Sequence, residues 1–261
     1  MQKRALLEIA VDNIGDAIAA VEAGADRLEV VADLLSHGLS PRPEFVAELK
    51  RALAGEGGQT VPLMAMVRPG PGSFVATPKL VARLMNQAED LLASGADGIV
   101  FGALDPAGHI DREAVRLLVR TAGTRETVFH RAFDLCPDPL GSLNVLKDHG
   151  VTRILTSGLD VRATAIALGL EEAGEVDAAC ALSGALGGAS LPMRLRRIRA
   201  FVEAAQGEME VLPCGGVRSH NVVQFLTDTG CGQVHSACRR AGADRLSRDE
   251  AAVIRRAIDA V

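Results

Sequence analysis

Aromatic side chains are scarce in this sequence. Its 261 residues include no tryptophan, no tyrosine and only 7 phenylalanines, and the formal net charge is -5. Nucleic-acid binding needs a basic surface and usually aromatic rings on which bases stack, so we expect no nucleic-acid partner. Long apolar runs are also missing, and none approaches the roughly 18 residues that span a bilayer. We therefore expect no membrane-spanning segment.

The N-terminal apolar run is short and is interrupted by Glu8. A signal-peptide core usually needs roughly 7 to 15 apolar residues, so we predict a cytoplasmic protein. The five cysteines include no C-x-x-C pair. Neither a disulfide framework nor a zinc knuckle is therefore indicated, and we expect the thiols to be reduced.

Runs rich in Val, Ile and Leu alternate with amphipathic stretches along the chain. Eight of these runs are predicted strands, at residues 5–10, 27–31, 61–67, 98–101, 127–130, 153–156, 210–212 and 233–235. Alternation of strands with helices means parallel pairing, because each crossover needs a covering helix. An open doubly wound sheet usually stops at about five or six strands, and no G-x-G-x-x-G follows the first strand. The sequence therefore predicts an α/β fold, a single-domain (β/α)8 TIM-type barrel over residues 1–261.

The spacing between the sixth and seventh predicted strands roughly doubles, over residues 161–207. We predict two helices here, joined by a loop of small residues, with the second helix at 192–205. Its arginines are predicted to lie on a solvated face, and a surface for an anionic partner is the alternative. These arginines are Arg194, Arg196, Arg197 and Arg199.

Polar residues at the predicted strand ends form a candidate catalytic set. Active sites of (β/α)8 barrels lie at the face formed by the C-terminal ends of the strands. Glu8 and Glu29 interrupt otherwise apolar strands, and a buried carboxylate is costly unless it is paired. Arginines follow the third and fifth strands and can supply the partners. The predicted catalytic residues are Glu8, Glu29, Arg68, His130, Arg131 and Asp134. A buried ion-pair network that only closes the barrel is the alternative.

The last two predicted strands are followed by residues suited to anion binding. Gly215 and Gly216 can offer backbone N–H groups beside a helix start, and Ser236 can do the same after the eighth strand. Glycines that serve only tight turns are the alternative. The predicted ligand-binding residues are Ser157, Gly158, Gly215, Gly216, His235 and Ser236, and the expected partner is a small anionic molecule.

Metal-binding candidates are few. Cys214 and His235 end neighbouring strands, but a buried, inert thiol is the simpler interpretation of Cys214. Met64 and Met66 lie two apart on one strand, and we assign them to core packing. These residues alone predict no resident cofactor.

Several motifs, in this order, resemble those of the CutC family, the so-called copper homeostasis proteins. They are Leu-Leu-Glu-Ile, Ala-Gly-Ala-Asp-Arg-Leu-Glu-Val, Gly-Leu-Ser-Pro, Val-Arg-Pro, Phe-His-Arg-Ala-Phe-Asp, Leu-Thr-Ser-Gly, Gly-Gly-Val-Arg and Val-His-Ser. The resemblance runs from about residue 6 to residue 236, and its most specific parts are residues 129–134 and 155–158. It implies a (β/α)8-type barrel, a cytoplasmic setting, self-association into a homo-oligomer and copper ion binding.

Two features depart from the copper-linked members of that family. Those members carry Cys after the Glu-Ile of the first strand and after the Glu-Leu of the second, where this chain has Ala10-Val11 and Val30-Val31. The thiolates that the resemblance assigns to Cu(I) are therefore missing. The residues at the strand ends suit acid–base chemistry on an anionic substrate better than binding of a soft metal. The segment 161–207 is also longer than in the family.

Three functional hypotheses follow. The first is an enzyme that acts on a small anionic, for example phosphorylated, substrate at the C-terminal face of the barrel. The second is a Cu(I)-binding or copper-trafficking protein, and the third is a barrel without turnover. They differ in what occupies the mouth of the barrel: an organic anion, Cu(I) on sulfur, or water.

Overall fold

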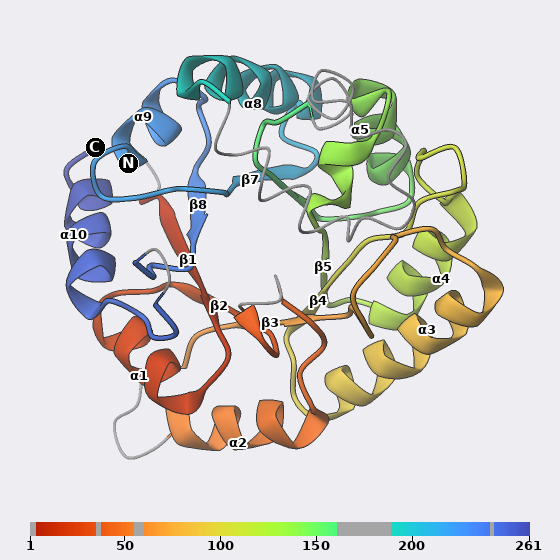
Figure 1. Ribbon diagram of the computed structural model, residues 1–261, viewed down its shortest axis with the longest axis horizontal. Helices are drawn as coiled ribbons and strands as arrows, with labels where there is room; N and C mark the ends of the chain where they lie inside the picture. Colours follow the sequence, from red (N-terminus) through yellow and green to blue (C-terminus); the bar gives the residue numbers. More distant parts are fainter. Residues whose placement is uncertain (1–3, 35–37, 55–59, 161–188, 241–242) are drawn as a thin grey trace.

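Eight parallel strands form one sheet in the order β7-β6-β5-β4-β3-β2-β1-β8. The sheet curls into a nearly closed barrel, and helices surround it (Figure 1). This computed structural model describes residues 4–34, 38–54, 60–160, 189–240 and 243–261. The strands are β1 (Leu6–Val11), β2 (Arg27–Val30), β3 (Leu63–Met66), β4 (Gly98–Phe101), β5 (Glu126–Phe129), β6 (Arg153–Thr156), β7 (Glu210–Pro213) and β8 (Gln233–Ser236). The predicted (β/α)8 TIM-type barrel is confirmed.

Helices follow the strands and cover the outside of the barrel (Figure 1). Most of them begin where a polar side chain accepts a hydrogen bond from the first turn, as Asn13 does from the N–H of Asp16 at 2.8 Å. The helices are α1 (Ile14–Glu22), α2 (Pro43–Leu53), α3 (Pro78–Ala93), α4 (Arg112–Ala122), α5 (Pro139–Asp148), α8 (Leu191–Ala205), α9 (Val222–Thr227) and α10 (Arg248–Asp259), with a 3-10 helix η2 (Arg131–Leu135) directly after β5. No helix in the described part of the chain is both long and apolar enough to span a membrane.

The barrel interior is filled in layers. An apolar layer of Val31, Met64, Met66, Val100, Val128, Leu155, Leu212 and Cys214 lies inside the sheet, separate from the larger core between sheet and helices. Met64 and Met66 therefore belong to a buried core, as predicted. Because such layers are closely packed, the interior of a (β/α)8 barrel is a solid core, and active sites lie at the end of the barrel formed by the C-terminal ends of the strands.

The first residues of five strands form a charged layer beneath the apolar one. The Arg27 guanidinium forms an ion pair with Glu8 and donates a 2.7 Å hydrogen bond to Gln233 Oε1. Arg153 forms an ion pair with Glu126 at 2.9 Å. Gln233 also donates to Glu210 at 3.1 Å, which joins β8 to β7 across the seam of the barrel. This network stabilises the end of the barrel at which the strands begin, opposite the face where active sites of this fold lie.

The segment 161–207 is described only in part. The first predicted helix lies outside the described residues, whereas the second is present as α8. Arg199 is exposed on this helix, with a side-chain exposure of 64%, but the prediction of a solvated face is wrong for Arg194. Its buried guanidinium donates to the carbonyls of Ser157, Cys214 and Gly215 at 2.7, 2.9 and 2.6 Å. The several donors of one guanidinium satisfy carbonyl groups that end β6 and β7.

Candidate functional site

A cavity of about 230 Å³ opens at the C-terminal ends of the strands. Its wall contains eight of the predicted site residues: Glu29, Arg68, His130, Arg131, Gly215, Gly216, His235 and Ser236. The other lining residues are Ala10, Leu34, Met66, Phe74, Leu155, Cys214, Arg218 and Ala237. Glu8, Asp134, Ser157 and Gly158 are absent from the lining and are buried behind it. The structure thus brings most of the predicted residues to one place.

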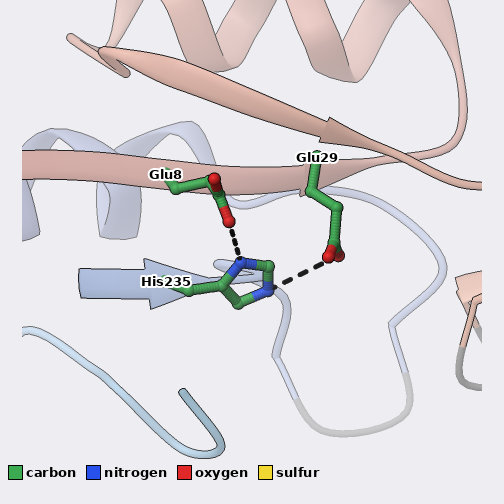
Figure 2. A group of neighbouring side chains, drawn as sticks. All are labelled: Glu8, Glu29 and His235. Carbon is green, nitrogen blue, oxygen red and sulfur yellow. Dashed lines mark hydrogen bonds and ion pairs between the residues drawn. The ribbon is translucent and has the colours of Figure 1, made fainter. Parts of the chain in front are cut away.

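His235 lies between two buried carboxylates from neighbouring strands (Figure 2). Glu8 on β1 is opposite His235 on β8 in the parallel register, and its Oε1 lies 2.7 Å from His235 Nδ1. The other imidazole nitrogen, Nε2, lies 3.8 Å from Glu29 Oε2 on β2. The second oxygen of Glu8 is taken by the Arg27 guanidinium. Glu8 therefore holds the ring from behind, while Glu29 and Nε2 share the space on its other side.

Burial and neighbouring charge set the protonation of this group. Burial alone would raise the pKa of Glu8, but Arg27 and His235 hold it well below its usual range. Burial alone would lower the pKa of His235, but the carboxylates of Glu29 and Glu8 raise it. Burial raises the pKa of Glu29 to about 7; the charge of His235 opposes this rise, and the negative charge of Glu8 adds to it. At neutral pH Glu8 is thus an anion, and Glu29 is divided between its two forms.

His130 is the electrically neutral histidine of the cavity wall. Burial, reinforced by the charge of Arg68, lowers the pKa of His130 to about 3. Its Nδ1 accepts a hydrogen bond from the N–H of Ala132 at 3.1 Å, so the ring carries its proton on Nε2. The Phe74 ring packs against it in a tilted orientation, with ring centroids 4.7 Å apart and an interplanar angle of 54°. The Arg68 guanidinium lies 5.4 Å from the Phe74 centroid. His130 is therefore an oriented, uncharged hydrogen-bond donor.

Gly102, beyond the end of β4, makes room for this histidine. A Cβ atom at Gly102 would lie 2.0 Å from His130 Cε1, a distance that no real contact reaches. Any side chain at this position must displace the imidazole ring. The absence of a side chain at Gly102 therefore leaves the space that the His130 ring occupies.

Asp134 holds the ends of β5 and β6 together. Its carboxylate accepts hydrogen bonds from the Oγ1 of Thr156 at 2.5 Å and from the N–H and Oγ of Ser157 at 3.0 and 2.5 Å. Arg131 Nε lies 3.4 Å from the same carboxylate. Gly158 follows with its N–H donated to Thr156 Oγ1 at 3.1 Å. The oxygens of Asp134 are thus used within the wall, and its predicted catalytic role stays a prediction.

The loops after β7 and β8 supply hydrogen-bond donors to the cavity. Gly215 and Gly216 have φ angles of +74° and +77°, which residues with a side chain rarely adopt. Within the described residues, no acceptor is found for the N–H groups of Gly215, Gly216 and Ala237. The Arg218 side chain is anchored beside them by hydrogen bonds to Ser236 Oγ at 3.3 Å and to the Arg239 carbonyl at 3.0 Å. Oriented N–H groups next to a guanidinium are a suitable environment for an anion.

Sequence reasoning missed Phe74 and Arg218 in this cavity. Arg218 carried a usable signal, because it follows Gly215 and Gly216 by two residues in Gly-Gly-Val-Arg. Phe74 lies in the loop between β3 and α3 and belongs to no periodic pattern, so only the folded chain could place its ring against His130.

The donor atoms of the described residues do not suit Cu(I). One group of three His, Cys, Asp or Glu ligand atoms within 4.8 Å of one another occurs in the described chain, and it consists of Glu8, Glu29 and His235. Cu(I) prefers sulfur. Cys214 lines the cavity, but burial raises the pKa of its thiol to about 12, so the thiolate that binds metals is disfavoured. Cys180 lies outside the described residues.

Comparison with known proteins places the chain in a family. Residues 5–175 match the sequence profile of the CutC family. The copper homeostasis protein cutC homolog of Homo sapiens is 31% identical over 234 residues, which are 90% of this chain and 73% of that protein. The family protein CutC of Treponema denticola is 33% identical over 235 residues, 90% of this chain and 82% of that protein.

Solved structures agree with this assignment. The copper homeostasis protein CutC of Streptococcus agalactiae superposes with a TM-score of 0.73 at 26% identity, covering 89% of this chain and 98% of that one. Thiamine phosphate pyrophosphorylase of Pyrococcus furiosus reaches a TM-score of 0.58 at 14% identity over 98% of this chain and 96% of its own, and this likeness concerns the fold alone. The barrel, the motifs at its strand ends and these relatives together show that the chain belongs to the CutC family.

Proposed function

We propose that the protein binds a small organic anion in the mouth of the barrel and acts on it there. The observation that carries the proposal is the composition of the cavity wall. Three arginines, Arg68, Arg131 and Arg218, line the cavity together with backbone N–H groups after β7 and β8. Charge-assisted hydrogen bonds from arginine to carboxylate or phosphate oxygens are among the strongest that proteins form.

The Arg218 side chain and the loop after β7 are held in place by hydrogen bonds within the protein. Arg218 is held by Ser236 and by the carbonyls of Val217 and Arg239, and the carbonyls of Cys214 and Gly215 are held by the buried Arg194. A ligand that binds here does not have to order these groups, so less of its binding energy is lost. In this proposal the arginines contact the anion, and His130 donates a hydrogen bond to it from Nε2.

The described lining residues favour non-covalent chemistry. None of them is a lysine, so none can form a Schiff base. The Ser236 hydroxyl donates to the Val217 carbonyl at 2.9 Å, and the Cys214 thiol is protonated at neutral pH because burial raises its pKa to about 12. A nucleophile needs an activating base or a lowered pKa. The wall therefore supports binding and polarising an anion rather than attacking it.

Cu(I) handling is the second candidate, because the human and mouse relatives are named copper homeostasis proteins. Its specific support in this structure is the presence of two sulfur side chains, Met66 and Cys214, in the cavity wall. The protonated thiol and the absence of a further sulfur ligand among the described lining residues make this site poor for Cu(I). Cytoplasmic location and self-association stay predictions.

Thermal unfolding in the presence of inorganic phosphate tests the anion site. An anion that binds only the folded protein stabilises it by about 2.7 kcal/mol at a hundredfold excess over its Kd. We expect phosphate to raise the melting temperature of the wild type and of Arg199→Met, whose side chain is exposed on α8. The same titration on Arg218→Met is expected to give little or no rise. An equal rise in both variants, or none in the wild type, would contradict the proposal.

A further inference from the structure

The part of the cavity wall formed by β8, β1 and β2 carries carboxylate and imidazole groups, whereas the rest of the wall carries the arginines. We propose that Glu29 and His235 bind a divalent metal ion of the Zn²⁺, Co²⁺ or Mn²⁺ class, with Glu8 holding the imidazole from behind. The metal site would deepen the proposed anion site, since oxygen atoms of the bound anion would complete the coordination. The metal site depends on the proposed anion site only for these additional oxygen ligands.

The distances in this group suit a shared cation. Glu29 Oε2 and His235 Nε2 are 3.8 Å apart, and both side chains line the cavity. Two ligand atoms that are each about 2.1 Å from a zinc ion are roughly 3.4 Å apart at a tetrahedral angle. Figure 2 shows the Glu29 carboxylate and the Nε2 side of His235 facing each other. A small rotation of this carboxylate would bring both atoms into range of one ion.

Glu29 also carries an oxygen without a partner. Its side chain is buried, with 4% of the residue exposed, and no hydrogen-bond donor from the described residues reaches Oε1. A buried carboxylate oxygen without a donor is costly. Glu8 adds a second negative charge nearby, and the positive charges that act on Glu29 within the described chain are those of His235 and, more weakly, Arg27. A metal ion bound by this carboxylate would compensate its buried negative charge.

Glu8 would orient His235 without itself binding the metal, and this role is called an outer anchor below. One of its oxygens lies 2.7 Å from His235 Nδ1 and the other is held by Arg27. Metal-binding histidines almost always donate their second ring N–H to a carboxylate, a backbone carbonyl or water, which fixes the tautomer and leaves the other nitrogen free for the metal. The opposed positions of Glu8 and His235 in the β1–β8 ladder build this arrangement directly.

The donor set decides which ions fit. One carboxylate oxygen and one imidazole nitrogen suit divalent ions such as Zn²⁺, Co²⁺ or Mn²⁺, whereas Cu(I) needs sulfur. Two protein ligands leave coordination positions open for oxygen atoms of a bound anion or of water, whereas purely structural zinc sites are closed by four protein ligands. The ion would polarise an oxygen of the anion that the arginines hold.

Metal titrations of untagged protein, stripped with EDTA and dialysed to pH 8, test the site. Calorimetry with Zn²⁺ alone and visible absorption with Co²⁺ alone are expected to show binding of one equivalent. This step should be lost in Glu29→Gln and in His235→Gln. Glu8→Gln should weaken it by about 10- to 100-fold, the usual cost of losing an outer anchor.

Two variants serve as matched controls. Cys214→Ser removes the thiol in the same cavity, and His109→Gln removes an exposed histidine from a separate surface depression that also contains Asp105, Asp111 and Asp138. Both should bind metal as the wild type does. Circular dichroism checks that Glu29→Gln is folded, so loss of binding in that variant reports on the ligand.

The outcomes separate this inference from the anion site. No one-equivalent step in the wild type, a step that survives Glu29→Gln, or a step lost in Cys214→Ser would each overturn the metal site. If phosphate still stabilises the EDTA-treated protein in that case, the anion site stands without the metal.

Discussion

Replacing Glu29 with glutamine should stabilise the protein at alkaline pH. Glu29 is buried, and burial raises its pKa from 4.5 to about 7. Ionisation of this carboxyl in the folded state is therefore unfavourable. Glutamine keeps the volume and removes the charge, so the variant does not bear this cost.

The size of the effect follows from linkage between protonation and folding. A group whose pKa is higher in the folded state contributes stability that is fully present below its unfolded pKa and is lost as pH rises through its folded pKa. Here the window runs from 4.5 to about 7. At about 1.4 kcal/mol for each pH unit, the loss for wild-type Glu29 is on the order of 3 kcal/mol by pH 8.

Urea unfolding of the EDTA-treated wild type and of Glu29→Gln, from pH 5 to pH 8, measures this loss. The two proteins should have similar free energies of unfolding at pH 5, and the variant should be more stable by on the order of 3 kcal/mol at pH 8. Glu113→Gln, at a carboxylate on the exposed face of α4, should show no such divergence with pH. A Glu29→Gln variant that is less stable than the wild type at pH 8 would refute the reasoning.

Three further predictions concern neighbouring residues. Glu8→Gln should lower the free energy of unfolding by about 3 to 5 kcal/mol, because it leaves the buried Arg27 without its ion-pair partner; an unchanged urea midpoint would contradict this. Gly102→Ala should keep the fold but displace the His130 ring, whose Cε1 would lie 2.0 Å from the new Cβ, and so reduce stabilisation by phosphate; an unchanged phosphate response would show that His130 does not contact the anion. Competition with a Cu(I) chelator should reveal no stoichiometric Cu(I) site, whereas a site that is lost in Met66→Leu would favour the copper function.

The sequence was sufficient for the barrel because its signals are local. Each strand is an apolar run and each intervening helix has its own periodicity, so eight repeats predict the architecture without knowledge of any contact. The same logic brought Glu29, His130 and His235 to one end, since all strand ends of a parallel barrel meet there. All three line the cavity.

The pairing of charges could not be predicted in this way. Glu8 was expected to face the arginines that follow the third and fifth strands, but its partner is Arg27, opposite it in the β1–β2 ladder. The strand register decides this pairing, and it is set by the closed barrel as a whole. Arg194 was misplaced for a similar reason, because the spacing of residues on a helix does not show which carbonyls lie within reach of a long side chain.

A crystal structure of the protein grown with phosphate tests the central claim most directly. We predict phosphate density in the cavity at the strand ends, in contact with the Arg218 guanidinium and with the N–H groups of Gly216 or Ala237. Phosphate bound only on the outer surface, with the cavity holding water alone, would contradict the claim that the mouth of this barrel is an anion site.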